Sequence, residues 1–364
     1  MIVAQVFAVV AGVAVVLWTL ASAVKTVVVP RAVITRLTRW HFVGIRKVFN
    51  LFAGTKRSFE TRDRIMSLYA PVSLVTLPAV WVCVVLAGFT SIFWGMGSRP
   101  VTEAFITSGS SLFTLGFVHP PGAPRIALAF AEAGIGLGLV SLMISYLPTI
   151  YGAFSRREAL VGMLEVRAGL PPSAAALLTR YTRIGWLDKI DEDLFERWEK
   201  WFIEVEESHT SQPSLNFFRS PHPERSWITA AGCVLDTASI VSSTIDRPYN
   251  ASCDIVIRTG FLCLRRISDL FQLPYNPDPA PTDPITVTRR EFDLLCVELR
   301  ALDVPLNRDL DQAWRDFNGW RVNYDQVLVQ LCALTMAPPA KWSSDRIEKL
   351  EIPQLRFRKR RGKS

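Results

Sequence analysis

The sequence predicts an all-α membrane protein with three transmembrane helices, a re-entrant pore helix and filter loop before the third, and a helical cytoplasmic domain. Three observations predict this class. The first 154 residues contain three apolar runs, each long enough for the ~20 residues that a helix needs to cross a bilayer. A shorter apolar segment lies between the last two runs. The residues after 154 have the mixed composition of a soluble domain, with apolar side chains at helical spacing.

The three predicted spans differ in their ends. Residues 1–24 contain no charged side chain before Lys25, and MIVAQVF lacks the basic start of a cleaved signal peptide, so a retained helix is favoured. The second span is predicted at about 68–95 and the third at about 125–154. At ~1.5 Å per residue the third helix is longer than a ~30 Å hydrocarbon core, so its end is expected to project beyond the membrane.

The basic residues predict an orientation. The 25–66 connection has ten Lys and Arg residues against two acids, whereas 96–124 has one of each sign. Because basic connections stay in the cytoplasm, the 25–66 segment and the C-terminal half are predicted to be cytoplasmic and the N-terminus outside, in a plasma membrane. The net charge of +8 comes largely from residues beside the apolar runs, which favours a membrane surface as partner over nucleic acid.

The basic 25–66 segment also has a helical pattern. Apolar side chains recur at helical spacing from Val33 to Phe52, and most of the basic residues fall on other faces. This pattern predicts an amphipathic helix. One interpretation places it on the inner leaflet, where anionic lipid would be its partner. The other packs it against the cytoplasmic domain, and the sequence does not separate the two.

The 96–124 connection is predicted to dip into the membrane and return. It is mostly apolar but too short to cross, and Glu103–Phe113 has the length of three helical turns. Pro100 suits the start of a helix, and Glu103 suits the positive end of its dipole, so Glu103 is expected to support the pore. Non-helical backbone at membrane depth is tolerated only inside protein or beside a watery cavity, which indicates a pore.

The order of a span, a short helix, a Thr-x-Gly-aromatic sequence and a second span resembles the pore-loop potassium channels over about residues 68–155. The segment EAFITSGSSLFTLGF is similar to that family's pore helix and selectivity filter, whose signature is Thr-Val-Gly-Tyr-Gly. The resemblance implies a homotetramer that holds potassium or another monovalent cation through backbone oxygens, with no other cofactor. The filter positions that it implies are Thr114, Leu115, Gly116 and Phe117.

Each filter residue has an expected task. Gly116 permits the left-handed dihedral angles that turn successive carbonyl groups toward one axis. The Thr114 hydroxyl would add an oxygen at the inner end of the filter. Leu115 and Phe117 would point back into the protein and brace the loop.

Two residues depart from the family's filter. Val118 replaces the second Gly, and because a β-branched residue avoids the left-handed region, Val118 is expected to be extended and the outer filter widened. Fewer coordination sites would weaken discrimination between potassium and sodium. His119 either gives the mouth a charge that changes at about pH 6.5 or caps the turn made with Pro120, and the turn is favoured. Arg99 and Arg125 are expected near the mouth, where they would repel cations.

The third span carries candidate gating residues. The resemblance implies a Gly hinge and a Pro bend, and the alternative for the glycines is close helix packing. The candidates are Gly134, Gly136, Gly138 and Pro148. Glu132 is the one acid within a predicted span, so it is expected to be protonated or hydrogen-bonded behind the filter, or, in the alternative, to form an ion-attracting ring. Its expected partners are the serines Ser108, Ser110 and Ser111.

The C-terminal half is predicted to be helical. Residues 226–245 are almost uncharged, but Asp236 and several hydroxyl side chains favour a buried helix over a fourth span. The six cysteines form no CxxC pair, which favours free buried thiols. The predicted organisation is an N-terminal span 1–24, a basic segment 25–66, a pore domain 67–155, a helical cytoplasmic domain 156–355 and a basic tail 356–364.

The function predicted from these features is a tetrameric channel for monovalent cations. The alternative is a membrane scaffold or sensor that keeps the channel architecture without ion flux. An enzyme is not predicted, because the sequence has no nucleotide-binding or catalytic motif. The partner of the cytoplasmic domain stays unknown.

Overall fold

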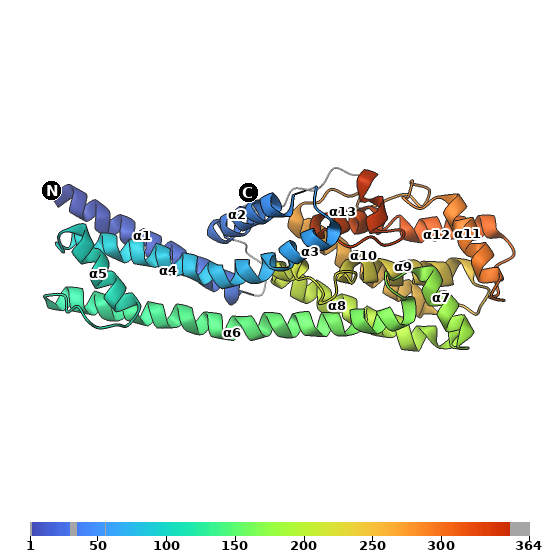
Figure 1. The fold of residues 1–364 in the computed structure, drawn as a ribbon, viewed down its shortest axis with the longest axis horizontal. Helices are drawn as coiled ribbons and strands as arrows, with labels where there is room; N and C mark the ends of the chain where they lie inside the picture. Colours follow the sequence, from blue (N-terminus) through green and yellow to red (C-terminus); the bar gives the residue numbers. More distant parts are fainter. Residues whose placement is uncertain (1, 30–34, 55, 350–364) are drawn as a thin grey trace. The chain divides into compact units, whose positions relative to one another are not determined.

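The computed structural model describes residues 2–29, 35–54 and 56–349, and within these ranges it is helical, with no β-strand (Figure 1). The predicted all-α class is therefore confirmed. The chain divides into two compact units, one of residues 1–51 and 68–152 and the other of residues 52–67 and 153–364. The basic tail predicted at 356–364 lies outside the described residues.

Three helices in the described part of the chain are long and apolar enough to cross a membrane. They contain α1 (Ile2–Val27), α4 (Tyr69–Gly95) and α6 (Ala123–Ala168). The three predicted spans are thus confirmed as helices. At ~1.5 Å per residue, α6 is about 70 Å long, more than twice the thickness of a hydrocarbon core, which agrees with the expectation that its end projects beyond the membrane.

Small residues bring α1 and α4 close together, and Figure 1 shows the two helices side by side. A Cβ on Gly12 would lie 2.6 Å from the Gly88 carbonyl oxygen, and a Cβ on Gly88 would lie 2.7 Å from a methyl group of Val16. A Cβ on Gly95 would meet the Gln5 carbonyl oxygen at 2.6 Å. Close backbone approach of this kind replaces the hydrophobic effect as the source of helix association in lipid.

We expect Gly88→Leu to separate α1 from α4, because the added side chain has no space beside Val16. Overpacking of this kind costs about 1–3 kcal/mol. Hydrogen–deuterium exchange measures it locally: amides along α1 should exchange faster in the variant. Gly44→Ala is the control, since a Cβ there meets nothing within 4 Å, and unchanged exchange in α1 for both variants would contradict the packing.

The amphipathic helix predicted in the basic segment is α2 (Arg36–Ala53), and one of its faces packs on α4. The Tyr69 hydroxyl donates to the Phe42 carbonyl at 3.2 Å, and His41 Nε2 is 2.9 Å from the Ser73 carbonyl oxygen. Trp40 and Leu51 are exposed. Neither interpretation included this contact with a span, and it leaves an apolar side of α2 open.

The second unit contains α3 and the helices that follow α6, all drawn in Figure 1. Apart from α3 (Phe59–Ser67), they are α7 (Ala174–Arg183), α8 (Glu196–Ser211), α9 (Trp227–Thr244), α10 (Ala251–Phe271), α11 (Arg289–Arg300), α12 (Leu310–Arg321) and α13 (Asp325–Thr335). Nearly every residue of α9 is buried in this unit, so the predicted buried helix at 226–245 is confirmed. The buried α9 side chains include Asp236, which forms an ion pair with Arg321 of α12.

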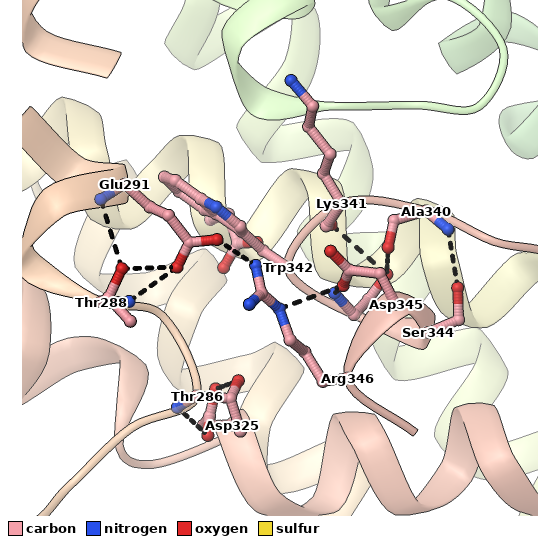
Figure 2. A network of polar contacts seen from close by, with 12 residues as sticks. Thr286, Thr288, Glu291, Asp325, Ala340, Lys341, Trp342, Ser344, Asp345 and Arg346 are labelled. Carbon is pink, nitrogen blue, oxygen red and sulfur yellow. Dashed lines mark hydrogen bonds and ion pairs between the residues drawn. The ribbon is translucent and has the colours of Figure 1, made fainter. Parts of the chain in front are cut away.

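Polar contacts fix the segment that contains Arg346 to α11 (Figure 2). The Thr288 hydroxyl accepts from the Glu291 amide at 3.3 Å, and the Glu291 carboxylate accepts from the Thr288 amide at 2.8 Å, which forms a capping box. The same carboxylate forms an ion pair with Arg346. Asp325 accepts from the Thr286 hydroxyl at 2.7 Å. These contacts hold the segment after α13 on the N-terminal end of α11.

An ion pair between Asp63 and Arg219 holds α3 in the second unit. Asp63 of α3 pairs with Arg219, which also donates to the Thr335 carbonyl at 2.7 Å and to the Met336 carbonyl at 3.2 Å. Since α3 leads directly into α4 along the chain, the second unit has a covalent connection to two of the spans, through α3 and through α6.

Candidate functional site

The short segment between the last two spans contains helix α5 (Val101–Leu112). The helix predicted at Glu103–Phe113 is therefore confirmed, and its N-cap is Pro100. Twelve residues give a length of about 18 Å, which is too short to cross a hydrocarbon core. Glu103 lies exposed in the first turn, and its expected supporting role stays a prediction.

Helix α5 packs on α6 through two pairs of residues, each pair one helical turn from the next. The Ser108 hydroxyl donates to Glu132 Oε1 at 2.5 Å. One turn on, a Cβ on Gly136 would overlap the Leu112 carbonyl oxygen, so this contact requires Gly. The last turn of α5 is therefore fixed on α6 by one hydrogen bond and one close backbone approach.

Glu132 is fully buried although it lies within a predicted span. Of the three expected serines, Ser108 is its hydrogen-bond partner. Its second carboxyl oxygen, Oε2, has no hydrogen-bond partner, and no ion pair to Glu132 occurs in residues 2–29, 35–54 and 56–349. The carboxyl group is therefore buried against α5 in the single chain, and its role in an assembled pore stays a prediction.

The loop after α5 folds back over the end of that helix. The amides of Leu115 and Gly116 both donate to the Ser110 carbonyl, at 2.8 and 3.3 Å. The Val118 amide donates to the Ser110 hydroxyl at 3.2 Å, and the Thr114 amide donates to the Ser111 carbonyl at 3.0 Å. Ser110 thus accepts three of these bonds and holds the loop in one conformation.

The carbonyl groups of the loop differ from the amides of residues 114, 115, 116 and 118, which all donate hydrogen bonds. In the described chain, the carbonyl oxygens of residues 114–118 accept no hydrogen bond. Gly116 has φ +71°, as expected, and Thr114 also lies in the left-handed region at φ +55°, which the sequence did not predict. Val118 is not among the residues with positive φ, in agreement with the expected extended conformation. The loop therefore combines two left-handed positions with carbonyl groups that have no hydrogen-bond donor in the described chain.

The side chains of Leu115 and Phe117 do not brace the loop within one chain. They are 62% and 64% exposed in the single chain, so the expectation that they point back into protein and brace the loop stays a prediction. The Thr114 hydroxyl donates to the neighbouring Phe113 carbonyl at 2.7 Å, and its lone pairs stay available to a ligand. Phe113 is itself 54% exposed, so the loop displays an apolar surface around its carbonyl groups.

Two arginines near the loop are occupied by the end of α4. Arg125 donates to the Met96 carbonyl at 2.5 Å, and the Arg99 guanidinium lies 4.6 Å from the centre of the Trp94 ring. Both cations thus lie against the C-terminal end of α4, where the helix dipole favours positive charge. Neither contact removes the charge of the guanidinium group, so the expectation that they repel cations at the mouth stays a prediction.

The three glycines of α6 have different surroundings. Gly136 is required by the close approach to Leu112, whereas a Cβ on Gly134 or Gly138 would meet nothing within 4 Å. The packing interpretation thus holds for Gly136, and the hinge interpretation stays a prediction for the other two. Pro148 lies inside the continuous helix α6. His119 is exposed, and its role also stays a prediction.

The role of Ser110 differs from the one that the sequence predicts. The sequence offers Ser110 as a possible partner of Glu132, whereas in the structure it accepts hydrogen bonds from amides of the loop. The sequence did contain a signal for this role. Two serines lie at the C-terminal end of a short helix, directly before a loop with a Gly, and hydroxyl groups there can accept hydrogen bonds from the amides of the loop. The Leu112 carbonyl carried no signal in the sequence, because a backbone contact does not depend on residue type.

Within the described ranges, no group of three or more His, Cys, Asp or Glu residues could hold a metal ion.

Comparisons with known proteins give a partial similarity. The chain is 30% identical over 128 residues to the sodium, potassium, lithium and rubidium/H(+) antiporter of Bacillus pumilus (strain SAFR-032). The match covers 33% of this chain and 19% of that protein, so the chain spans about a fifth of the length of the relative it matches. No protein-family model and no solved structure matches the chain. The match and the three apolar helices together indicate a membrane protein.

Proposed function

We propose that four copies of this chain form a pore-loop channel for monovalent cations, with the carbonyl oxygens of residues 114–117 around the pore axis. The observation that carries the proposal is the division of the loop's polar groups. The amides of Thr114, Leu115, Gly116 and Val118 are bound to Ser110 and Ser111, while the carbonyl oxygens of the loop accept no hydrogen bond within the described chain. Bare carbonyl groups at membrane depth need a cation or water.

Two further features support this function. The exposed side chains of Phe113, Leu115 and Phe117 need a cover, and neighbouring copies around a four-fold axis would supply it. The partial relative is, by its name, a transporter of monovalent cations, which agrees with this class of ion. In the proposed assembly the N-terminus lies outside a plasma membrane, the second unit lies in the cytoplasm, and α2 contacts anionic lipid of the inner leaflet.

Flux into liposomes tests the proposal. Purified protein should carry potassium, and also sodium, down a gradient, because Val118 leaves fewer coordination sites than the family's filter has. Gly116→Ala should reduce flux at least tenfold, since φ +71° disfavours any residue with a Cβ by about 1–2 kcal/mol in each of four chains. Gly44→Ala in α2 is the control and should conduct normally.

Native mass spectrometry of the same sample should show four chains. A monomer or dimer would contradict the assembly. A tetramer without flux of sodium, potassium, lithium or rubidium would favour the scaffold or sensor. Cation flux that occurs only in exchange for protons would favour an antiporter, as in the relative.

A further inference from the structure

We propose that Glu132 is a proton-binding site, held as a neutral acid behind the loop and coupled to the loop's conformation. The protonation state rests on geometry alone. The coupling to ion flux rests on the function proposed above, so the two parts need separate measurements.

The contacts of the carboxyl group favour its neutral form. Glu132 is fully buried, and among the described residues Ser108 is its one hydrogen-bond partner, through Oε1, while Oε2 has none. An ionised carboxylate needs two or three donors or a cation, and burying it without them costs several kcal/mol. A neutral carboxylic acid needs fewer hydrogen-bond partners than a carboxylate. It can donate its proton to Ser108, whose own hydroxyl proton is then free for the Leu86 carbonyl of α4, 3.3 Å away.

Within the described residues, Glu132 forms no ion pair. The titratable groups on the elements packed around it include Cys83 on α4, Glu103 on α5, His119 in the loop, and Arg125 on α6 itself. Arg125 binds the Met96 carbonyl, and the other three are exposed. In the described residues none of the four forms a hydrogen bond or an ion pair with Glu132.

The position of Glu132 connects its proton to the loop. Its partner Ser108 lies two residues before Ser110, which holds the amides of the loop. One turn along α6, Gly136 contacts the Leu112 carbonyl, directly before the loop begins. When the proton leaves to water, Ser108 must turn its hydroxyl proton to the carboxylate, and Oε2 must find water or another donor. The first change needs only a rotation of the Ser108 hydroxyl, whereas a donor for the buried Oε2 needs space beside α5. We therefore expect ionisation to displace the last turn of α5 and alter the loop.

Infrared spectroscopy on the full-length protein in lipid vesicles tests the protonation state without any need for flux. At neutral pH we expect a carbonyl stretch of a protonated carboxyl group that shifts in D2O and disappears in Glu132→Gln. Ser108→Ala should shift this band without removing it, because the acid loses its hydrogen-bond partner. Glu60→Gln, at an exposed position in α3, is the matched control and should leave the band unchanged.

Each outcome decides one part of the proposal. A band that is absent at neutral pH, or that persists in Glu132→Gln, would overturn the proton site whether or not the protein conducts. If the band titrates at alkaline pH and wild-type flux changes over the same range, while flux in Glu132→Gln does not, the coupling is supported. A titrating band with flux unaffected by that pH range would overturn the coupling alone. A folded wild type with the band and with no flux would contradict the channel and leave the proton site established.

Discussion

Arg321→Met should destabilise the second unit by about 3–5 kcal/mol, because it leaves two buried carboxylates without their cation. Arg321 is fully buried in α12, between Asp236 of α9 and Asp325 of α13. Its Nε donates to Asp325 at 2.8 Å, and its remaining donors reach Asp236 and the Trp342 carbonyl. One guanidinium thus joins three parts of the unit, and Met offers none of these hydrogen bonds.

The loss of stability in Arg321→Met should depend on pH. Burial raises the pKa of Asp236 to about 6, and the neighbouring Arg321 opposes that rise. The folded pKa exceeds the ~3.9 of an unfolded chain, so the folded state binds this proton more tightly and stability falls as pH rises through that interval. Without Arg321 the fall extends to higher pH. The difference between variant and wild type should therefore be larger at about pH 7.5 than at about pH 5.

The reactivity of buried thiols measures the unfolding of the second unit. Cys233, Cys263 and Cys332 are buried in the second unit, whereas Cys83 in α4 is exposed. In a Cys83→Ser background, a thiol-reactive dye should report unfolding of the second unit about 10 °C lower in Arg321→Met. The control is Arg315→Met, an exposed position in the same helix. Replacing the two carboxylates by Asn as well should restore part of the stability, and no recovery would contradict uncompensated charge as the cause.

Gly136→Ala should disrupt the contact between α5 and α6, whereas Gly134→Ala should not. The two glycines lie two residues apart in α6, yet a Cβ on Gly136 would overlap the Leu112 carbonyl oxygen and a Cβ on Gly134 would meet nothing within 4 Å. The blocking atom belongs to the backbone, so it cannot turn aside as the end of a flexible side chain could. We expect α5 to move away from α6, at a cost of about 1–3 kcal/mol or more.

A spin label at position 115 measures the effect at the loop. It is attached to the thiol that Leu115→Cys introduces, in a chain that also carries Cys83→Ser. The label should become more mobile in Gly136→Ala and stay unchanged in Gly134→Ala. The same displacement should weaken the Ser108–Glu132 hydrogen bond. Equal label mobility in both variants would show that the close approach at Gly136 does not position the loop.

The hydrophobic pattern of the sequence determined most of the fold. Long apolar runs define α1, α4 and α6, and the short run between the last two defines α5, because the bilayer sets the length that a crossing helix needs. Asp236 marked α9 as a buried helix, not a fourth span, since a charge in lipid is costly. At the site, the chemistry of Glu132 and Gly116 was also predictable. A buried acid needs a hydroxyl partner, and a left-handed position favours Gly.

Only the tertiary structure decided which groups meet. It selected Ser108 for Glu132 and gave Ser110 to the loop, and it assigned close packing to Gly136 and left Gly134 open. It also placed Arg321 between carboxylates of two other helices. Residue type and periodicity describe the faces of one helix, whereas these contacts depend on how two helices are rotated and shifted against each other. A backbone carbonyl such as that of Leu112 has no mark in the sequence, because every residue carries one.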